Sequence, residues 1–430
     1  NECTDDFRIG VPFEQNLQID SGKGVCSGSC ENCDNQIKSA NEFTVRKLAL
    51  VLTSSCNMRC RYCYANYGMY DYEKAADMNA EKLESVLSYF TKNFKGIGAI
   101  QFFGGEPTLK EDLIYQTVDY FERMVQSGEI KTMPVFGIVT NGVYMPDKLV
   151  DYFKKYSFFV TVSLDGPILV NDTLRIDCSG HGKYKSIWAN IAKIQNAGIN
   201  GLSFECTYTA EHIRNSISLV DLIKFFDKEF NNPVVHIAPV NIDNNHYLSL
   251  VPYKDKYNQY MEELVDYTFD MLLEEKKMCS TNIVLGVITR IISQASQKAI
   301  CPAGVNTFSV SHDNKISPCF MYTSKDDISY GNIGDDPDEI LSRAYTFDEY
   351  INNKDKVDEC QECFARNVCS SCLGSFEIKS DKVQISNPIY CESIKVATKR
   401  ALQRLSDIKK NPKTWEEFNR FLDKGYEERR

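Results

Sequence analysis

The chain of 430 residues is 43% hydrophobic and 12% aromatic, which is enough to bury a sizeable core in two or three domains. Its net charge of −10 and pI near 5.2 argue against nucleic acid or an anionic membrane surface as a partner, because both are bound through clustered lysine and arginine. No apolar stretch reaches the roughly 18 residues of a membrane span, and the start of the chain lacks the apolar core of a secretory signal. We therefore expect a cytoplasmic protein.

The chain carries 17 cysteines and only 5 histidines. Most of the cysteines fall in tight clusters, which favours thiolate ligation of metal centres over disulfides between distant loops. A reducing, oxygen-poor cytoplasm suits such thiols.

The first segment, 1–45, holds a CxxxCxxC run at Cys26, Cys30 and Cys33, and Cys3 is available as a fourth ligand. The surrounding residues are rich in Gly, Ser and Asn and lack apolar periodicity. Two interpretations stay open, a small iron–sulfur or zinc site and a cysteine-rich segment without metal.

From Arg46 to about Val240, short β-prone runs alternate with longer amphipathic runs, as in βα units around a parallel sheet. The expected strands are 48–52, 99–103, 135–140, 158–164, 201–207 and 234–239. The expected helices are 80–93, 111–127, 146–156, 184–197 and 213–230. In such sheets functional groups gather on the loops at the carboxyl ends of the strands.

The first expected strand is followed by Cys56, Cys60 and Cys63, spaced CxxxCxxC. Three thiolates can hold three irons of a [4Fe–4S] cube and leave the fourth iron open to a substrate or cofactor. Ferredoxin runs use a CxxCxxC spacing and a further cysteine, and zinc sites pair cysteines as CxxC. The alternatives are buried thiols or a partial zinc site.

With Tyr62 as the aromatic residue before the last cysteine, this run resembles the signature of the radical S-adenosylmethionine (SAM) enzymes. The resemblance implies a partial (β/α)₆ barrel in an α/β fold. It also implies that the open iron chelates SAM, and that one electron cleaves SAM to a 5′-deoxyadenosyl radical that abstracts a substrate hydrogen. Cys56, Cys60 and Cys63 are then the catalytic ligands.

Motifs after the next strands resemble SAM-binding elements of that family. Gly104, Gly105 and Glu106 match the segment that holds the SAM amino group. Ser163 and Asp165 are expected at the ribose hydroxyls, although a strand-ending Asx turn is the structural alternative. Arg175 is expected at the SAM carboxylate, which suits its forked guanidinium, and a plain surface arginine is the alternative.

The segment 301–391 resembles the SPASM domain, which carries two auxiliary [4Fe–4S] clusters. The resemblance assigns Cys360, Cys363, Cys369 and Cys391 to an outer cluster. It assigns Cys301, Cys319 and Cys372 to an inner cluster with an open iron. Asn314 stands where the family has a turn glycine, and Asn tolerates the same left-handed conformation. The spacing Cys369-Ser-Ser-Cys372 is one residue shorter than usual. A zinc ribbon is the alternative for the cysteines from 360 to 372.

These resemblances imply four parts: the segment 1–45, a radical SAM barrel with following helices over 46–300, the SPASM domain over 301–391, and C-terminal helices over 392–430. Cys178, Cys206 and Cys279 stand apart from the clusters and are expected as unreactive buried thiols.

The function implied is a peptide maturase that joins a cysteine of a ribosomally made precursor peptide to another residue as a thioether. An external flavodoxin- or ferredoxin-type protein supplies electrons. An anaerobic sulfatase-maturing activity, which makes formylglycine, is the alternative enzyme. A multi-cluster electron-transfer protein is the alternative from another class.

Overall fold

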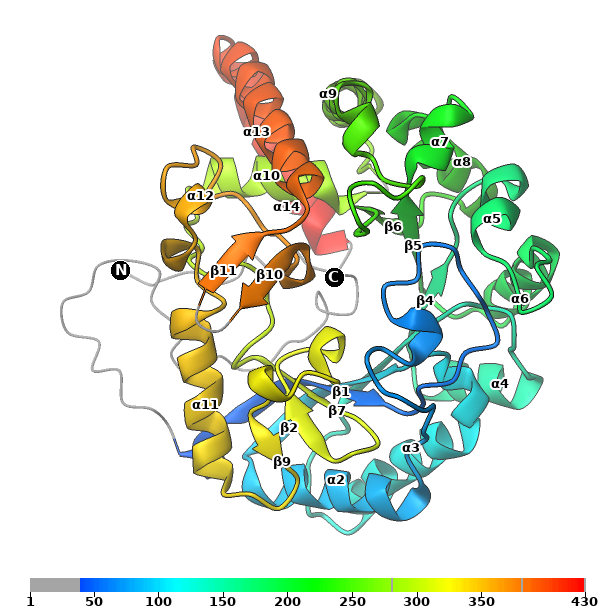
Figure 1. Cartoon of the computed structure of the whole chain (residues 1–430). Coiled ribbons are helices and arrows are strands. Elements are labelled where there is room, and N and C mark those ends of the chain that lie inside the picture. The colour runs from blue at the N-terminus through cyan, green and yellow to red at the C-terminus, as the bar shows by residue number, and fades with distance from the viewer. Residues whose placement is uncertain (1–38, 280, 380–381, 429–430) are drawn as a thin grey trace.

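The computed structural model describes residues 39–279, 281–379 and 382–428 (Figure 1). Its largest element is a sheet of nine strands in the order β6-β5-β4-β3-β2-β1-β7-β8-β9. The first six strands are parallel and curve around a central space, with their connecting helices on the outside (Figure 1). The predicted α/β class with a partial six-unit barrel is confirmed.

The barrel strands are β1 (Thr44–Val51), β2 (Gly96–Phe103), β3 (Val135–Thr140), β4 (Phe159–Ser163), β5 (Gly201–Tyr208) and β6 (Val234–Pro239). The helices outside them are α2 (Ala80–Asn93), α3 (Glu111–Gln126), α4 (Asp147–Lys155), α5 (Ile168–Leu174), α6 (Tyr184–Asn196), α7 (Ala210–Arg214) and α8 (Leu219–Phe230). The sequence did not predict α5, because seven residues are too few to establish a helical period.

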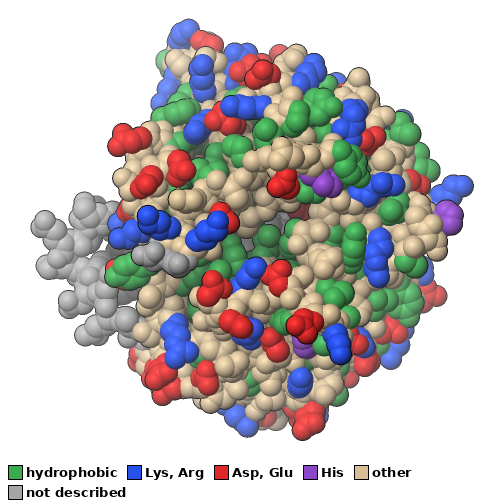
Figure 2. Space-filling model, in the orientation of Figure 1, with side chains coloured by type: hydrophobic (Ala, Val, Ile, Leu, Met, Phe, Trp, Pro, Cys, Tyr) green, Lys and Arg blue, Asp and Glu red, His purple; other side chains and the backbone are tan. Residues whose placement is uncertain are grey.

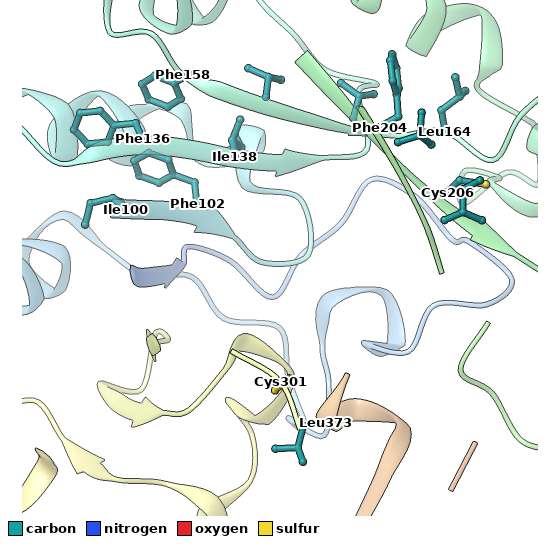
Figure 3. Close-up of a cluster of buried hydrophobic side chains, with 14 of the residues drawn as sticks. Ile100, Phe102, Phe136, Ile138, Phe158, Leu164, Phe204, Cys206, Cys301 and Leu373 are labelled. Atoms are coloured by element: carbon teal, nitrogen blue, oxygen red, sulfur yellow. The ribbon is translucent and has the colours of Figure 1, made fainter. Parts of the chain in front are cut away.

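Aromatic side chains fill the layer between the strands and the outer helices. Phe102, Phe136 and Phe158 stack on one another, with ring centroids 5.3 Å apart for Phe136 and Phe158 and 5.9 Å apart for Phe102 and Phe158 (Figure 3). Each buried phenylalanine contributes roughly 1.5–3 kcal/mol through the apolar area removed from water. This layer fixes the strands against the helices.

The inner face of the barrel changes character along the strands. Because side chains alternate between the two faces of a strand, Ala99 points away from the phenylalanine layer. It packs with Val135 and Phe159 in a separate small apolar cluster toward the amino ends. Further along, Thr161 and Ser203 hydrogen bond across the neighbouring strands at 2.9 Å. The interior is therefore apolar at one end and polar toward the carboxyl ends.

The sheet continues past the domain boundary expected at residue 301. Strand β7 (Thr307–Val310) pairs in parallel with β1, and β8 (Lys315–Ser317) and β9 (Gly331–Asn332) follow in antiparallel order. The predicted turn conformation of Asn314 is confirmed by its φ of +64°. The carboxyl-terminal part is thus joined to the barrel through backbone hydrogen bonds.

The remaining elements lie beside the open side of the six-stranded arc, opposite α3 and α4 (Figure 1). They are α9 (Lys254–Asp270), the π-helical segment η5 (Met271–Glu275), α10 (Asn282–Ser293), α11 (Pro337–Tyr350), α12 (Asp358–Gln361), the hairpin β10 (Phe376–Lys379) and β11 (Lys382–Ile385), α13 (Pro388–Lys409) and α14 (Pro412–Glu428). The two helices expected at the tail are α13 and α14. Arg400 and Arg404 of α13 both pair with Asp266 of α9, at 2.8 and 3.1 Å. None of the described helices has the length and apolarity to cross a lipid bilayer.

The three isolated cysteines have different environments. Cys206 and Cys279 are fully buried, as predicted. The prediction for Cys178 was wrong, because its side chain is exposed. It lies in a turn where the Asp177 Oδ1 accepts the backbone N–H groups of Ser179 and His181, so the turn satisfies its own polar groups at the surface.

Candidate active site

The CxxxCxxC loop lies at the carboxyl end of β1. Its three thiols are free and partly buried. Burial raises the pKa of Cys60 to about 12, the nearby Arg175 acts in the opposite direction, and Asp165, Cys63 and Cys56 add to the rise. Because these charges act on the Cys60 thiol, the three sulfurs lie near one another and near Arg175 and Asp165.

The glycine motif after β2 allows its loop to pack directly on the cysteine loop. The Gly105 N–H donates to the Thr53 carbonyl at 2.8 Å, and the Glu106 N–H donates to the Ser55 carbonyl at 2.9 Å. A Cβ on Gly105 would collide with the Ser55 carbonyl, and Gly104 has a φ of +146° that L side chains rarely adopt. The glycines therefore serve first to bring two backbones together.

Glu106 is buried, with 1% of its surface exposed, and both carboxylate oxygens accept hydrogen bonds. Oε1 accepts from the Thr108 N–H and from the hydroxyls of Thr108 and Thr140, and Oε2 accepts from the Asn141 N–H at 2.7 Å. Burial raises the pKa of Glu106, against these hydrogen bonds, which lower it. The carboxylate thus ties the ends of β2 and β3 together, and its contact with a SAM amino group stays a prediction.

Tyr62, Asp165 and Arg175 form a buried network. The Tyr62 hydroxyl donates to the Asp165 Oδ2 at 2.6 Å and accepts from the Arg175 Nη1 at 2.8 Å. The Asp165 Oδ1 accepts from the Thr207 N–H at 3.0 Å. The Arg175 Nε is buried without a protein partner among the described residues. A guanidinium N–H left open in this way fits the carboxylate of a bound amino acid such as the one in SAM.

Asn141 contacts the cysteine loop directly, a role that the sequence did not assign. Its Nδ2 donates to the Asn57 Oδ1 at 2.7 Å and lies 3.7 Å from the Cys56 Sγ. The sequence signal was its segment Thr140-Asn141-Gly142, which follows a predicted strand and resembles a SAM-site element of the radical SAM family. Ser163, half-buried at the end of β4, stands on the same edge, in register with Glu205 of β5.

The structure brings Cys301, Cys319 and Cys372 together as the inner set. Burial raises the pKa of Cys319 to about 11, and Cys372 adds to the rise. Burial likewise raises the pKa of Cys301, with contributions from Cys372 and Cys319. The residue after Cys319, Phe320, stacks on Phe103 at the end of β2 with ring centroids 3.7 Å apart. The inner set therefore borders the mouth of the barrel.

Two buried hydroxyls near the inner set have no partner among the described residues, those of Tyr322 and Tyr330. The pKa of Tyr322 is raised by burial and then by the charges of Cys319 and the other two inner cysteines, which places its ring beside them. An unpartnered buried hydroxyl is costly, and the sulfurs of an iron–sulfur cluster are acceptors that would satisfy it. The inner set fits such a cluster.

The four cysteines of the outer set line one pocket, which confirms that they lie together: Cys360, Cys363, Cys369 and Cys391. Lys354 borders the same pocket with 2% of its surface exposed. Its ammonium donates to the carbonyls of Gln297, Arg366 and Cys369 at 2.9, 3.0 and 2.6 Å. A buried cation therefore lies beside the outer set, and no sequence signal predicted it.

Within the described part of the chain, no three His, Cys, Asp or Glu side chains converge closely enough to hold one metal ion. A [4Fe–4S] cube distributes its ligands over separate irons, so its thiolates stand further apart than the ligands of a single zinc ion. The predicted site at Cys3, Cys26, Cys30 and Cys33 lies outside the described residues.

Known proteins share this sequence pattern. Residues 50–212 match the family model of the radical SAM superfamily. Over 376 residues the chain is 24% identical to a cysteine-type anaerobic sulfatase-maturating enzyme of Clostridium perfringens, with 84% of this chain and 97% of that protein covered.

Solved structures share the fold. Native anSMEcpe with bound AdoMet superposes with a TM-score of 0.70 at 21% identity, over 84% of this chain and 98% of that one. Streptococcus suis SuiB bound to its precursor peptide SuiA gives a TM-score of 0.51 at 14% identity, over 77% and 72% of the two chains. The superfamily match and the CxxxCxxC loop at the end of β1 together identify residues 50–212 as a radical SAM domain, and the chain as an enzyme that carries it.

Proposed function

We propose that this enzyme is a peptide maturase that joins the sulfur of a peptide cysteine to another residue of the same peptide as a thioether. The observation that carries the proposal is the inner set of three cysteines at the barrel mouth, which among the described residues is one thiolate short of a closed cluster. A fourth position left open there suits a thiolate from the substrate. Similarity to SuiB, which was solved with a precursor peptide, supports a peptide as the substrate.

The residues around the first cluster site have distinct tasks in this proposal. Cys56, Cys60 and Cys63 hold the first cluster, and Arg175 receives the SAM carboxylate on its open Nε. Gly104, Gly105 and Glu106 border the SAM amino group, with Ser163 and Asp165 near the ribose. When bound, the cluster and SAM supply one-electron chemistry that removes a hydrogen atom from the substrate. The protein positions the substrate and keeps water out.

The carboxyl-terminal sets hold two auxiliary clusters in this proposal, for three clusters in all. The outer set, closed by four thiolates, passes electrons to or from a flavodoxin- or ferredoxin-type partner. The inner set binds the peptide thiol, which lowers the thiol pKa and orients the sulfur. A cytoplasmic location remains part of the proposal.

Formylglycine formation is the second candidate. It is supported by the similarity to the cysteine-type sulfatase-maturating enzyme, which extends over 84% of this chain. Both reactions begin by removing a hydrogen atom from a substrate peptide, and both use a cysteine side chain. They differ in whether the sulfur remains in the product.

The first test uses anaerobically reconstituted protein. Iron per chain and 5′-deoxyadenosine released from SAM under a reductant are measured beside the triple Cys56→Ala, Cys60→Ala, Cys63→Ala variant. We expect the variant to lose deoxyadenosine formation and keep most of its iron. An iron-loaded wild-type protein that releases none, with or without cysteine peptides, would favour the electron-transfer alternative.

Product mass then separates the two enzyme candidates. A thioether product loses two hydrogens and retains its sulfur. A formylglycine product loses sulfur and gains oxygen. Sulfur loss from the peptide would therefore overturn the thioether proposal while the radical SAM assignment stands.

A further inference from the structure

A carboxylate and an imidazole face the barrel interior from two neighbouring strands. Glu205 of β5 is in register with Ser163 of β4 on one side and with His236 of β6 on the other. Parallel neighbours in register point to the same face of the sheet. Glu205 also alternates with the fully buried Phe204 and Cys206, which point toward the outer layer. The row Ser163, Glu205, His236 therefore lies along the polar end of the barrel interior.

Glu205 and His236 form a close pair. The Glu205 Oε1 lies 2.8 Å from the His236 Nδ1. About a third of each side chain is exposed, 32% for Glu205 and 34% for His236. Figure 2 shows that this face of the molecule is hollowed near its centre. The two side chains are thus held together, and each is partly exposed.

The same carboxylate lies close to the inner set. Burial raises the pKa of Cys372, backbone N–H groups lower it, and the charge of Glu205 adds to the rise. Burial also raises the pKa of Tyr390 on α13, with a contribution from Glu205. Glu205 therefore lies beside Ser163, expected at the SAM ribose, and within electrostatic range of Cys372 of the inner set. A substrate thiol bound at the inner set would lie near this carboxylate.

Two other carboxylates among the described residues at this end already accept hydrogen bonds within the protein. Glu106 accepts four hydrogen bonds and Asp165 accepts from Tyr62 and Thr207, and both are almost fully buried. Neither presents an open oxygen to the barrel interior as Glu205 does.

Crosslinking a cysteine requires a proton acceptor. One hydrogen leaves the peptide carbon as an atom and ends in 5′-deoxyadenosine, the sulfur–carbon bond forms, and the S–H bond breaks. One electron and the thiol proton remain. The electron passes to the cluster at the inner set, which leaves the proton without an acceptor in the proposed function. Formylglycine formation from cysteine also needs an acceptor for the proton of the substrate thiol.

We propose that Glu205 and His236 together accept the proton of the substrate thiol as its sulfur binds at the inner set. This inference rests on the proposed function. The carboxylate holds the imidazole through Nδ1 and stabilises the imidazolium that forms, which is the usual role of a carboxylate beside a catalytic histidine. Cys372, Tyr390 and Cys206 are the other titratable groups whose charges interact with Glu205.

The test uses 2-mercaptoethanol as the thiol and the electron paramagnetic resonance signal of the reduced auxiliary clusters as the readout. Thiol binding is followed from acid to alkaline pH in the wild-type enzyme and in the Glu205→Gln and His236→Asn variants. Glu262→Gln, which removes an exposed carboxylate on α9, is the matched control. Iron content and thermal unfolding verify that each variant folds and holds its clusters.

We expect wild type and the control to bind the thiol at a pH midpoint well below the pKa of free 2-mercaptoethanol. Both test variants should move that midpoint up by about one pH unit, a tenfold loss of thiol affinity at neutral pH. An unchanged midpoint in iron-loaded variants would overturn the role of the pair and leave the proposed function standing. Absence of thiol binding in wild type would overturn the open inner site itself, and with it the proposed function.

Discussion

The Tyr62 hydroxyl donates to the Asp165 Oδ2 at 2.6 Å across 103 residues of sequence. Tyr62 lies between Cys60 and Cys63, and Asp165 follows the end of β4. The same hydroxyl accepts from the Arg175 Nη1. One phenol therefore fixes the cysteine loop against the two residues expected to bind SAM.

Replacing Tyr62 by Phe should loosen this junction. The hydroxyl is removed and two buried charged groups each lose a hydrogen bond, which should lower the free energy of unfolding by about 1–3 kcal/mol. SAM should bind more weakly, as measured by calorimetry on reconstituted protein. Tyr144→Phe is the control, because that side chain is 41% exposed. Equal SAM affinity in wild type and Tyr62→Phe would contradict a positioning role for the network.

Gly105→Ala should separate the glycine loop from the cysteine loop, because the new Cβ meets the Ser55 carbonyl. We expect a loss of about 1–3 kcal/mol in the free energy of unfolding, typical of an overpacked site. Incorporation of the first cluster should fall with it, measured as iron per chain. Gly96→Ala at the start of β2 has no atom within 4 Å of the new Cβ and should leave both quantities unchanged. Similar losses in the two variants would refute the steric explanation.

Lys354→Met tests the buried cation beside the outer set. The change leaves three carbonyls without their donor and removes a positive charge next to the outer cysteines. The reduction potential of the outer cluster should become more negative, because net charge near a cluster sets its potential. A potentiometric titration followed by electron paramagnetic resonance measures the shift. Lys395→Met borders the same pocket but is more exposed, and it should have a smaller effect.

His212 should make stability depend on pH. Its Nδ1 accepts from the Thr209 N–H at 3.1 Å and its Nε2 meets the Asp165 carbonyl at 2.9 Å, an arrangement for a neutral ring. Burial lowers the pKa of His212 below its usual 6.5, against smaller raising contributions from Asp165 and the backbone. The unfolded chain therefore takes up a proton near pH 6.5 that the folded chain resists.

The free energy of unfolding should consequently fall as the pH drops below 6.5, by at most about 1.4 kcal/mol per pH unit for this one group. The loss stops once the pH passes the lower pKa of the folded state. Urea unfolding across this range should show a shallower dependence in His212→Gln. The exposed His181→Gln should retain the wild-type slope. A His212→Gln profile parallel to wild type would show that the ring does not carry this dependence.

Local sequence signals predicted much of the barrel. The strands at 135–140 and 234–239 and the helix at 80–93 have the predicted bounds, since alternation and helical period are local properties. Other features escaped prediction for a physical reason. Pairing of β7 with β1 joins segments more than 250 residues apart, and no local pattern encodes such a partner.

Short sequence motifs indicate the kind of chemistry that the protein supports. The spacing of Cys56, Cys60 and Cys63 and the glycines after the next strand fix a loop that suits one iron–sulfur cluster, because ligand spacing and backbone freedom are properties of short segments. The packing of distant segments settles which side chains surround the three cysteine sets. Glu205 with His236, Lys354 beside the outer set and Asn141 at Cys56 gain their roles from strand register and burial, which depend on how distant segments pack.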